Sequence, residues 1–226
     1  MSRFTCLLLT VALFSGACNN PKPAASVEPA EQHGPAKVAK WAPRPFPTDQ
    51  VNLLAMGDWG SGGQEQRDVA QSIAKYVSRT GLQFNGLLTC GDNFYVPLKD
   101  ADDYHFQTLF EDMFDAKVIN FPFYVSLGNH DFEKDKWKYE LAYAANYPDS
   151  RWKLPSRWYR LDLPEEKPLV TILMLDGNYT ASRFSEADWQ LERQWLSDQL
   201  DEVRPPGGPS RRTWVICCAH VPPAFP

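Results

Sequence analysis

Apolar runs that stop at a polar residue are the feature of this sequence that most constrains its fold. Residues 87–91 lead into Asp92, and residues 51–57 lead into Asp58; the last residue of each run is a glycine. Such short runs are typical of buried strands in a layered α/β protein. Glycine lets the chain turn sharply away from a strand. Each aspartate is therefore expected at the carboxyl end of a strand, where open α/β sheets place their ligand sites.

The same pattern recurs further along the chain. One aspartate after a glycine is most often only a turn residue, so the repetition carries the argument. Parallel neighbouring strands would bring the polar ends to one edge of the sheet. Carboxylate and imidazole ligands suit Fe, Mn or Zn, and a phenolate such as that of Tyr95 adds a preference for Fe(III). The other runs and the residues that follow them are 121–127 with Gly128, Asn129, His130 and Asp131; 169–175 with Asp176; and 213–218 with Ala219 and His220.

Four motifs occur in a fixed order along these runs. They are residues 57–60 (Gly-Asp-Trp-Gly), 91–95 (Gly-Asp-Asn-Phe-Tyr), 128–131 (Gly-Asn-His-Asp) and 219–223 (Ala-His-Val-Pro-Pro). As an ordered set they resemble purple acid phosphatases of the calcineurin-like metallophosphoesterase superfamily, although each motif alone would be weak. The small, tartrate-resistant type also shares residues 100–114, 158–161 and 174–176. The resemblance covers residues 51–226.

The resemblance implies an α+β fold, a layered α/β/β/α sandwich of two mixed sheets. It also implies a dinuclear centre of Fe(III) and a divalent metal ion, which can be Fe, Zn or Mn. Asp58, Asp92 and Tyr95 would hold the ferric ion. Asp92 would bridge to the divalent ion, which Asn129 and His220 would also hold.

Gly60 marks the branch of the superfamily that the sequence resembles. The wider metallophosphoesterases carry Asp-x-His in the first motif, and Gly60 stands where that histidine would be. Glycine has no side-chain donor, and the hydroxyl of Tyr95 would restore one. The alternative for Tyr95 is a core tyrosine with a hydrogen-bonded hydroxyl. Asn129 could likewise be a plain turn residue.

His130 matches the substrate-facing histidine of the family. It would donate a proton to the leaving-group oxygen and hold the phosphate; the alternative is a core histidine with satisfied hydrogen bonds. The implied reaction is in-line attack by a metal-bound hydroxide on a phosphomonoester, as in an acid phosphatase. Asp131 and Asp176 are interpreted as carboxylates that either support the ligands or have a structural role. A phosphodiesterase of the same superfamily and an inactive phosphate-binding or scaffold protein are the alternative functions.

The sequence departs from the family at its C-terminal end. The last family motif, Gly-His-x-His, would supply one histidine to each metal ion, and it is absent from the sequence. Neither His33, in the leader, nor His105, on a helix face expected to be exposed, fits that role. We therefore expect a truncated chain that lacks the C-terminal part of the second sheet, so the family assignment does not by itself imply activity.

The N-terminus has the features of a targeting segment. Arg3 precedes an apolar run over residues 4–14 that is too short to span a bilayer, so residues 1–17 are interpreted as a signal peptide. Small residues before Cys18 resemble a bacterial lipoprotein motif, which predicts lipidation of Cys18; the alternative is simple secretion. Residues 18–50 are rich in Pro and Ala and are expected to be a tether. The predicted location is extracytoplasmic, either secreted or anchored as a lipoprotein.

The remaining composition limits the partners of the domain expected over residues 51–226. A net charge of −5 argues against a nucleic-acid-binding surface. The resemblance implies a small phosphorylated substrate, and a monomer is expected. Membrane contact is expected only through the lipid anchor. Three cysteines lie in apolar runs, where buried free thiols are the default, and no disulfide framework is visible: Cys90, Cys217 and Cys218.

Helical periodicity is found between the apolar runs. Residues 185–188 resemble a capping box with Asp188 in the position that Glu or Gln usually takes. A further strand is predicted over 158–163. The predicted helices are 64–78, 103–114, 134–147 and 185–203.

Overall fold

The structure is a computed structural model that describes residues 49–178, 185–205, 207–209 and 214–221. The predicted signal peptide and Cys18 lie outside the described residues, as does most of the predicted tether. No helix in the described ranges is long and apolar enough to cross a membrane.

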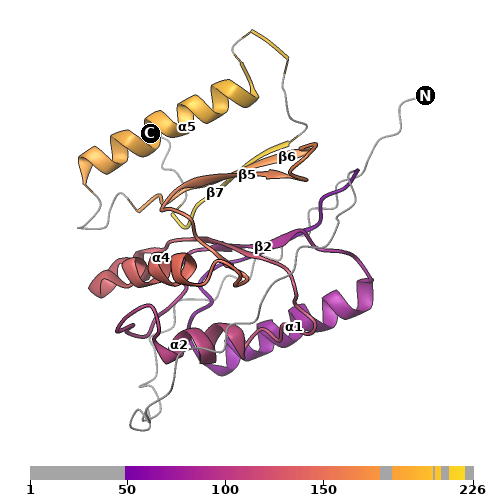
Figure 1. The fold of residues 1–226 in the computed structure, drawn as a ribbon, viewed down its shortest axis with the longest axis vertical. Coiled ribbons are helices and arrows are strands. Elements are labelled where there is room, and N and C mark those ends of the chain that lie inside the picture. The colour runs from indigo at the N-terminus through magenta and orange to yellow at the C-terminus, as the bar shows by residue number, and fades with distance from the viewer. Residues whose placement is uncertain (1–48, 179–184, 206, 210–213, 222–226) are drawn as a thin grey trace.

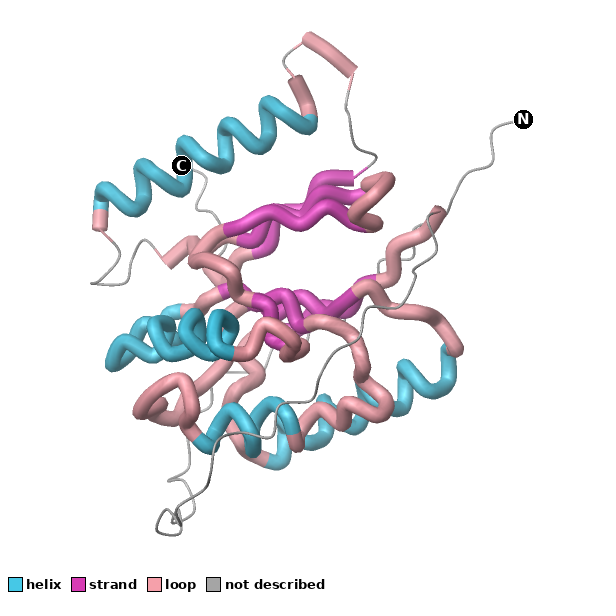
Figure 2. Tube along the Cα trace, in the orientation of Figure 1, coloured by secondary structure: helices cyan, strands magenta, loops and turns pink. Residues whose placement is uncertain are grey.

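Two β-sheets stack face to face, and helices cover both outer sides (Figure 1). The expected layered α+β sandwich is therefore confirmed. Helix α5 (Glu186–Val203) covers one sheet, and α1 (Gln64–Thr80) and α4 (Lys136–Asn146) cover the other. Figure 2 shows the two groups of strands between these outer helices.

The first sheet is parallel in every described pairing. Its order is β1 (Leu53–Met56), β2 (Gly86–Cys90), β3 (Phe123–Ser126) and β4 (Trp152–Lys153). The expectation that both sheets are mixed is wrong for this one. Long connections that contain helices separate its strands, and such crossovers allow parallel neighbours.

The second sheet is mixed, as expected. Strand β5 (Tyr159–Leu163) pairs antiparallel with β6 (Val170–Met174), because a short connection joins them. Strand β6 pairs parallel with β7 (Trp214–Cys218), which returns after α5. All five apolar runs are observed as strands, namely β1, β2, β3, β6 and β7, and β5 is the strand predicted over 158–163.

The helix predicted over 64–78 is confirmed as α1 and extends to Thr80. Gly81 ends it in the left-handed region, with φ 64°, where glycine is favoured. Helix α5 begins with the predicted capping box. The Asp188 N–H donates to the Ser185 hydroxyl at 3.1 Å, and the Ser185 N–H donates to the Asp188 carboxylate at 3.2 Å.

The middle of the chain differs from the prediction in its helix boundaries. The predicted helix over 103–114 is a short α-helix, α2 (Tyr104–Phe106), that continues into a π-helix, η1 (Gln107–Glu111). The predicted helix over 134–147 divides into the 3₁₀ turn η2 (Glu133–Asp135) and α4. Lys134 and Asp135 have φ of 55° and 62°, so the α-helical conformation cannot pass through them. The two-residue strand β4 was not predicted, because it is too short to show a period.

Two burial predictions are also corrected. The His105 imidazole is only 16% exposed, because its Nδ1 lies 2.7 Å from the carboxylate of Asp103, the residue that caps α2. Cys217 is exposed, whereas Cys218 is buried, because neighbouring residues on a strand point to opposite faces.

Aromatic side chains fill the layer between the first sheet and its helices. Trp152 of β4 is fully buried and contacts Phe94, Phe106 and Phe110, with ring centroids 5.1–5.7 Å apart. This layer supports the strand ends that carry the candidate site.

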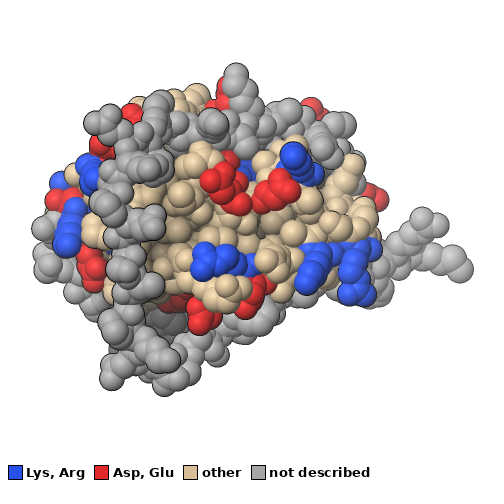
Figure 3. Space-filling view, turned by 90° about the horizontal axis from the view of Figure 1, so that it is seen from below, with Lys and Arg blue, Asp and Glu red and all other residues tan. Residues whose placement is uncertain are grey.

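On the face seen from the bottom of Figure 1, Lys and Arg lie interspersed with Asp and Glu (Figure 3).

Candidate metal centre

The loops after β1 and β2 are joined by three backbone hydrogen bonds. The N–H of Asp58 donates to Gly91 O at 3.1 Å, that of Gly60 to Asp92 O at 3.2 Å, and that of Tyr95 to Gly60 O at 3.1 Å. Asp58 and Asp92 both have positive φ, 55° and 54°. Non-glycine residues rarely adopt this conformation, which clusters at functional sites. The two loops thus hold both aspartates in matching conformations at one edge of the first sheet.

Gly60 allows these loops to approach each other. A Cβ at position 60 would lie 1.9 Å from the carbonyl oxygen of Asn93, and backbone atoms cannot move aside as a side chain can. Gly128 is similarly constrained, because its Cβ would lie 2.2 Å from the Asp92 carboxylate. A histidine at position 60 is therefore incompatible with this packing. The glycine that distinguishes the first motif has a steric role here.

The donors expected to bind metal converge on the space above these loops. Ligand atoms of Asp58, Asp92 and His220 all lie within 4.8 Å of one another. The Tyr95 hydroxyl donates to Asp92 at 3.0 Å and lies 3.4 Å from the Asp58 carboxylate. Burial and the two carboxylates raise the pKa of the Tyr95 phenol above its ordinary value. Only a nearby cation would offset this effect and favour the phenolate.

His220 presents its Nε2 to the same space. Its Nδ1 lies 2.8 Å from Cys90 O, and a carbonyl can only accept, so Nδ1 carries the proton. In this tautomer Nε2 carries the lone pair that a metal ion needs, and it lies 3.0 Å from Asn129 Oδ1 and 3.5 Å from Asp92 Oδ1. A ring fixed in this tautomer by a backbone carbonyl is the usual arrangement of a metal-ligating histidine. Asn129 is the first residue of the short helix α3 (Asn129–Phe132), and its contact with His220 places its side chain at the centre.

His130 lies at the rim of the centre. Its backbone N–H donates to Asp92 at 3.0 Å, and its ring centroid lies 4.6 Å from that of Tyr95. The imidazole Nδ1 lies 3.1 Å from the carboxylate of Glu133, and the His130 side chain is 36% exposed. The His130 side chain is therefore held by Glu133 while it stays partly open to solvent.

Asp131 is a fully buried support for the loops. Its carboxylate accepts hydrogen bonds from the backbone N–H groups of Asn93, Phe94 and Gly128, at 2.7–3.2 Å. Burial raises the pKa of Asp131 to about 6, although these donors oppose the rise. The interpretation of Asp131 as a supporting carboxylate is consistent with these contacts.

Asn93 and Glu140 are supporting residues that the sequence did not identify. The Asn93 amide donates to Ser126 O at 2.8 Å and to Glu140 at 3.0 Å, while its oxygen accepts from the Trp59 indole at 3.0 Å. Burial raises the pKa of Glu140 well above its ordinary value. The position of Asn93 within the second motif was the available signal for its role; Glu140 lies on α4, and no motif marks it.

Asp176 follows β6 but does not join the donors. Its carboxylate accepts from Arg157 at 2.7 Å and from Asn178 at 2.7 Å, and its N–H donates to Glu192 of α5 at 2.7 Å. Asp176 thus fastens the second sheet to its covering helix.

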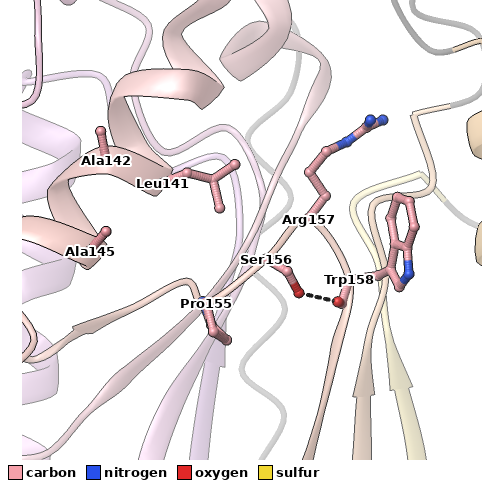
Figure 4. Close-up of a pocket in the computed structure, with 7 residues that line it drawn as sticks. All are labelled: Leu141, Ala142, Ala145, Pro155, Ser156, Arg157 and Trp158. Carbon is pink, nitrogen blue, oxygen red and sulfur yellow. Dashed lines mark hydrogen bonds between the residues drawn. The ribbon is translucent and has the colours of Figure 1, made fainter.

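A separate apolar cavity lies away from this centre. It has a volume of about 670 Å³ and lies between α4 and the segment that precedes β5 (Figure 4). Ala142 and Leu141 line one side, and Arg157 and Trp158 line the other. None of the candidate metal ligands lines it, so it is distinct from the metal centre.

The donor set fits a cation. Asp58 and Asp92 place two carboxylates beside a phenol and an imidazole, and such oxygen and nitrogen donors suit Fe, Zn or Mn. Within the described part of the chain, no Lys or Arg forms an ion pair with either aspartate; the His220 ring lies 3.5 Å from Asp92. A cation would supply the missing positive charge.

Comparisons with known proteins give the same family. The model of the calcineurin-like phosphoesterase family matches residues 51–225. Tartrate-resistant acid phosphatase type 5 of Sus scrofa is 37% identical over 194 residues, which cover 79% of this chain and 56% of that protein. The Mus musculus protein of the same name is 36% identical and covers 78% of this chain and 57% of its own length. The chain spans somewhat more than half the length of these relatives.

More distant matches extend the comparison. Purple acid phosphatase 4 of Arabidopsis thaliana is 26% identical, over 82% of this chain and 56% of that protein. Among solved structures, one described as "GAP50 the anchor in the inner membrane complex of Plasmodium" has the same fold, with a TM-score of 0.58 and 18% identity over 75% of this chain and 54% of that one. The chain belongs to the calcineurin-like phosphoesterase family, and its relatives include tartrate-resistant and purple acid phosphatases.

Proposed function

We propose that this protein is an acid phosphatase that hydrolyses small phosphate monoesters at a dinuclear centre of Fe(III) and a divalent ion, either Fe, Zn or Mn. The observation that carries the proposal is the convergence of Asp58, Asp92, Tyr95 and His220, which come from strand ends of both sheets. The similarity to purple acid phosphatases supports the same assignment.

Each donor has a role in holding the metals. Asp58 and Tyr95 would hold the ferric ion, because a carboxylate and a phenolate are hard anionic donors. Asn129 and His220 would hold the divalent ion, and Asp92, which lies between the two groups, would bridge. When bound, the two cations supply Lewis acidity and lower the pKa of water, so that hydroxide is available near neutral pH.

His130 supplies the proton chemistry in this proposal. The Glu133 carboxylate lies 3.1 Å from Nδ1, so it orients the ring and leaves the other nitrogen toward the substrate. From there His130 would hold a phosphate oxygen and donate a proton to the leaving-group oxygen. The Asp92 carboxylate accepts the His130 backbone N–H, which fixes the position of this residue against the centre.

The test is hydrolysis of p-nitrophenyl phosphate by the metal-loaded protein at mildly acidic pH, with metal analysis of the same sample. His130→Ala is expected to lower kcat by about 10²–10⁴-fold while the metal content stays unchanged. The matched control is His105→Ala, because His105 pairs with Asp103 outside the centre. Equal turnover of the His130 variant and the wild type would refute the role of His130.

Two alternatives would give different results in the same assay. A phosphodiesterase would prefer bis(p-nitrophenyl) phosphate to the monoester. A phosphate-binding or scaffold protein would retain metals yet hydrolyse neither compound. The Plasmodium neighbour is described as an anchor, which makes this second alternative worth the measurement.

We also propose that the protein acts outside the cytoplasm as a monomer whose only membrane contact is a lipid on Cys18. The support is the apolar run of residues 4–14 and the small residues before Cys18. Mass spectrometry of the native protein is expected to find Cys18 as a lipidated first residue. An unmodified Cys18, or a different first residue, would exclude lipidation.

A further inference from the structure

Two cysteines meet where the two sheets pack together. Cys90 is the last residue of β2 in the first sheet, and Cys218 is the last residue of β7 in the second. Their Sγ atoms lie 3.4 Å apart, although 128 positions separate them in the sequence. Cys218 is 6% exposed, and Cys90 is half-buried. The pair therefore joins the two layers of the sandwich at one point.

Both cysteines lie close in sequence to candidate metal ligands. Cys90 precedes Asp92 by two residues, and Cys218 precedes His220 by two. The Cys90 carbonyl accepts the hydrogen bond that fixes the His220 ring, at 2.8 Å. The contact between the sulfur atoms thus lies two residues before the contact between Asp92 and His220 on both chain segments. A covalent bond here would hold one ligand-bearing loop against the other.

We propose that Cys90 and Cys218 form a disulfide that fastens the two sheets together behind the metal centre. A disulfide bond is about 2.05 Å long, so the sulfur atoms need to approach by about 1.4 Å. The two side chains already face each other, since their Sγ atoms lie within hydrogen-bonding distance. The described cysteines are free in this structure.

The oxidant in this reaction is a disulfide, either oxidised glutathione or an oxidoreductase in its disulfide form. Cys90, the more accessible of the two, attacks one sulfur of the oxidant, loses its proton, and forms a mixed disulfide while one thiol of the oxidant leaves. Cys218 then attacks the Cys90 sulfur and loses its proton, and the second thiol leaves. The two cysteines are oxidised by two electrons, and the oxidant is reduced to two thiols.

Cys217 provides an internal control. It neighbours Cys218 on β7, but its side chain is exposed and lies on the opposite face of the strand. Cys217 therefore cannot form the same bond without a change in the register of β7. The inference rests on the packing of one sheet against the other, which brings the two sulfur atoms together, and it does not depend on the proposed hydrolytic function.

The test begins with the full chain carrying Cys217→Ser, treated with oxidised glutathione. This substitution is needed because one tryptic peptide, which begins after Arg212, contains both Cys217 and Cys218. The remaining thiols are alkylated in denaturant before digestion, and the peptides are identified by mass spectrometry without reduction. The expected product is a single linked pair of peptides that contain Cys90 and Cys218. Alkylation of both cysteines, or a link from Cys90 to another cysteine, would overturn the proposal.

A second measurement tests the effect on stability. Oxidised wild-type protein is expected to melt about 5–10 °C higher than the same protein after treatment with a phosphine reductant. The double variant Cys90→Ser with Cys218→Ser is measured in the same two conditions, so that any effect of the reductant on bound metal cancels. A reductant-dependent shift of equal size in both proteins would overturn the role of the disulfide. The first measurement stays decisive if the double variant does not fold.

Discussion

The His220 imidazole lies 3.5 Å from the Asp92 carboxylate, although the two residues follow strands of different sheets. Asp92 follows β2, and His220 follows β7. Their proximity depends on the packing of the two sheets, since no backbone pairing joins β2 to β7. The candidate centre is therefore sensitive to changes far from it that alter how the layers stack.

Gly60→Ala is expected to destabilise the protein by about 3 kcal/mol, at the upper end of the cost of overpacking. The added Cβ would lie 1.9 Å from a backbone oxygen, so the two ligand-bearing loops must separate. Urea denaturation measures the change. Gly63→Ala is the control, because its Cβ would meet only the side chains of Glu65 and Ser61, and it is expected to cost about 1 kcal/mol or less. Equal stability of the two variants would show that the loops can separate freely.

Arg151→Met is expected to destabilise the protein by about 3–5 kcal/mol, because it leaves a buried charge unpaired. Arg151 is fully buried, and its guanidinium donates to Glu111 at 2.8 Å and to Ile119 O at 2.8 Å. Chemical denaturation of the variant measures this cost.

The matched control for Arg151 is Lys138→Met. Lys138 forms an exposed ion pair with Asp135 at 3.4 Å, and such pairs contribute about 1 kcal/mol or less. A loss at Arg151 no larger than the loss at Lys138 would mean that Glu111 is relieved by protonation or by water.

The sequence predicted that the candidate donors would lie together at one edge of the sheet, but it did not predict which residues support them. Asp58, Asp92 and Asn129 could be placed because each lies just after an apolar run, and the end of a buried strand has a known position in a parallel sheet. Glu140 could not, because it reaches the Asn93 amide from α4, 47 positions away, and only the packed structure joins them. The later start of α4 was also hidden, because positive φ at Lys134 and Asp135 leaves no mark in residue type.

Glu192→Gln is expected to remove a pH dependence of stability. Burial raises the pKa of Glu192 to about 7, and the Asp176 carboxylate adds to the rise, although the N–H of Asp176 donates to Glu192 at 2.7 Å. An acid with a raised pKa binds its proton more tightly in the folded state. Its contribution to stability is therefore full below the unfolded pKa, about 4.5, and is lost as pH rises through about 7.

The measurement is the unfolding free energy at about pH 5 and about pH 8. At the higher pH, the unfolding free energy of Glu192→Gln is expected to exceed that of wild type by about 1–3 kcal/mol. At the lower pH, the two unfolding free energies are expected to differ little. Glu186→Gln, an exposed glutamate on the same helix, is the control and is expected to change neither value. A gain that does not depend on pH would show that Glu192 stays ionised in the folded protein.

Tyr95→Phe is expected to remove the colour of the iron-loaded protein. In the proposed centre the phenolate of Tyr95 binds Fe(III), and charge transfer from tyrosinate to iron gives a pink to purple absorption. The substitution keeps the aromatic ring, whose centroid lies 4.6 Å from that of the His130 ring. It deletes only the hydroxyl oxygen, which lies 3.0 Å from the Asp92 carboxylate. The affinity for iron is expected to fall by at least about 10–100-fold, because loss of a direct ligand costs no less than loss of a supporting contact.

Absorbance spectra and elemental analysis of wild type and variant measure both effects. Tyr76→Phe is the matched control, because Tyr76 lies on α1, away from the centre, and packs against Phe84. This variant is expected to keep its colour and its iron. If the Tyr95 variant retains its colour, another residue binds the ferric ion. If the active wild-type protein contains two zinc ions instead, Tyr95 acts through its hydrogen bonds to Asp58 and Asp92, and the preference of this centre for iron is wrong.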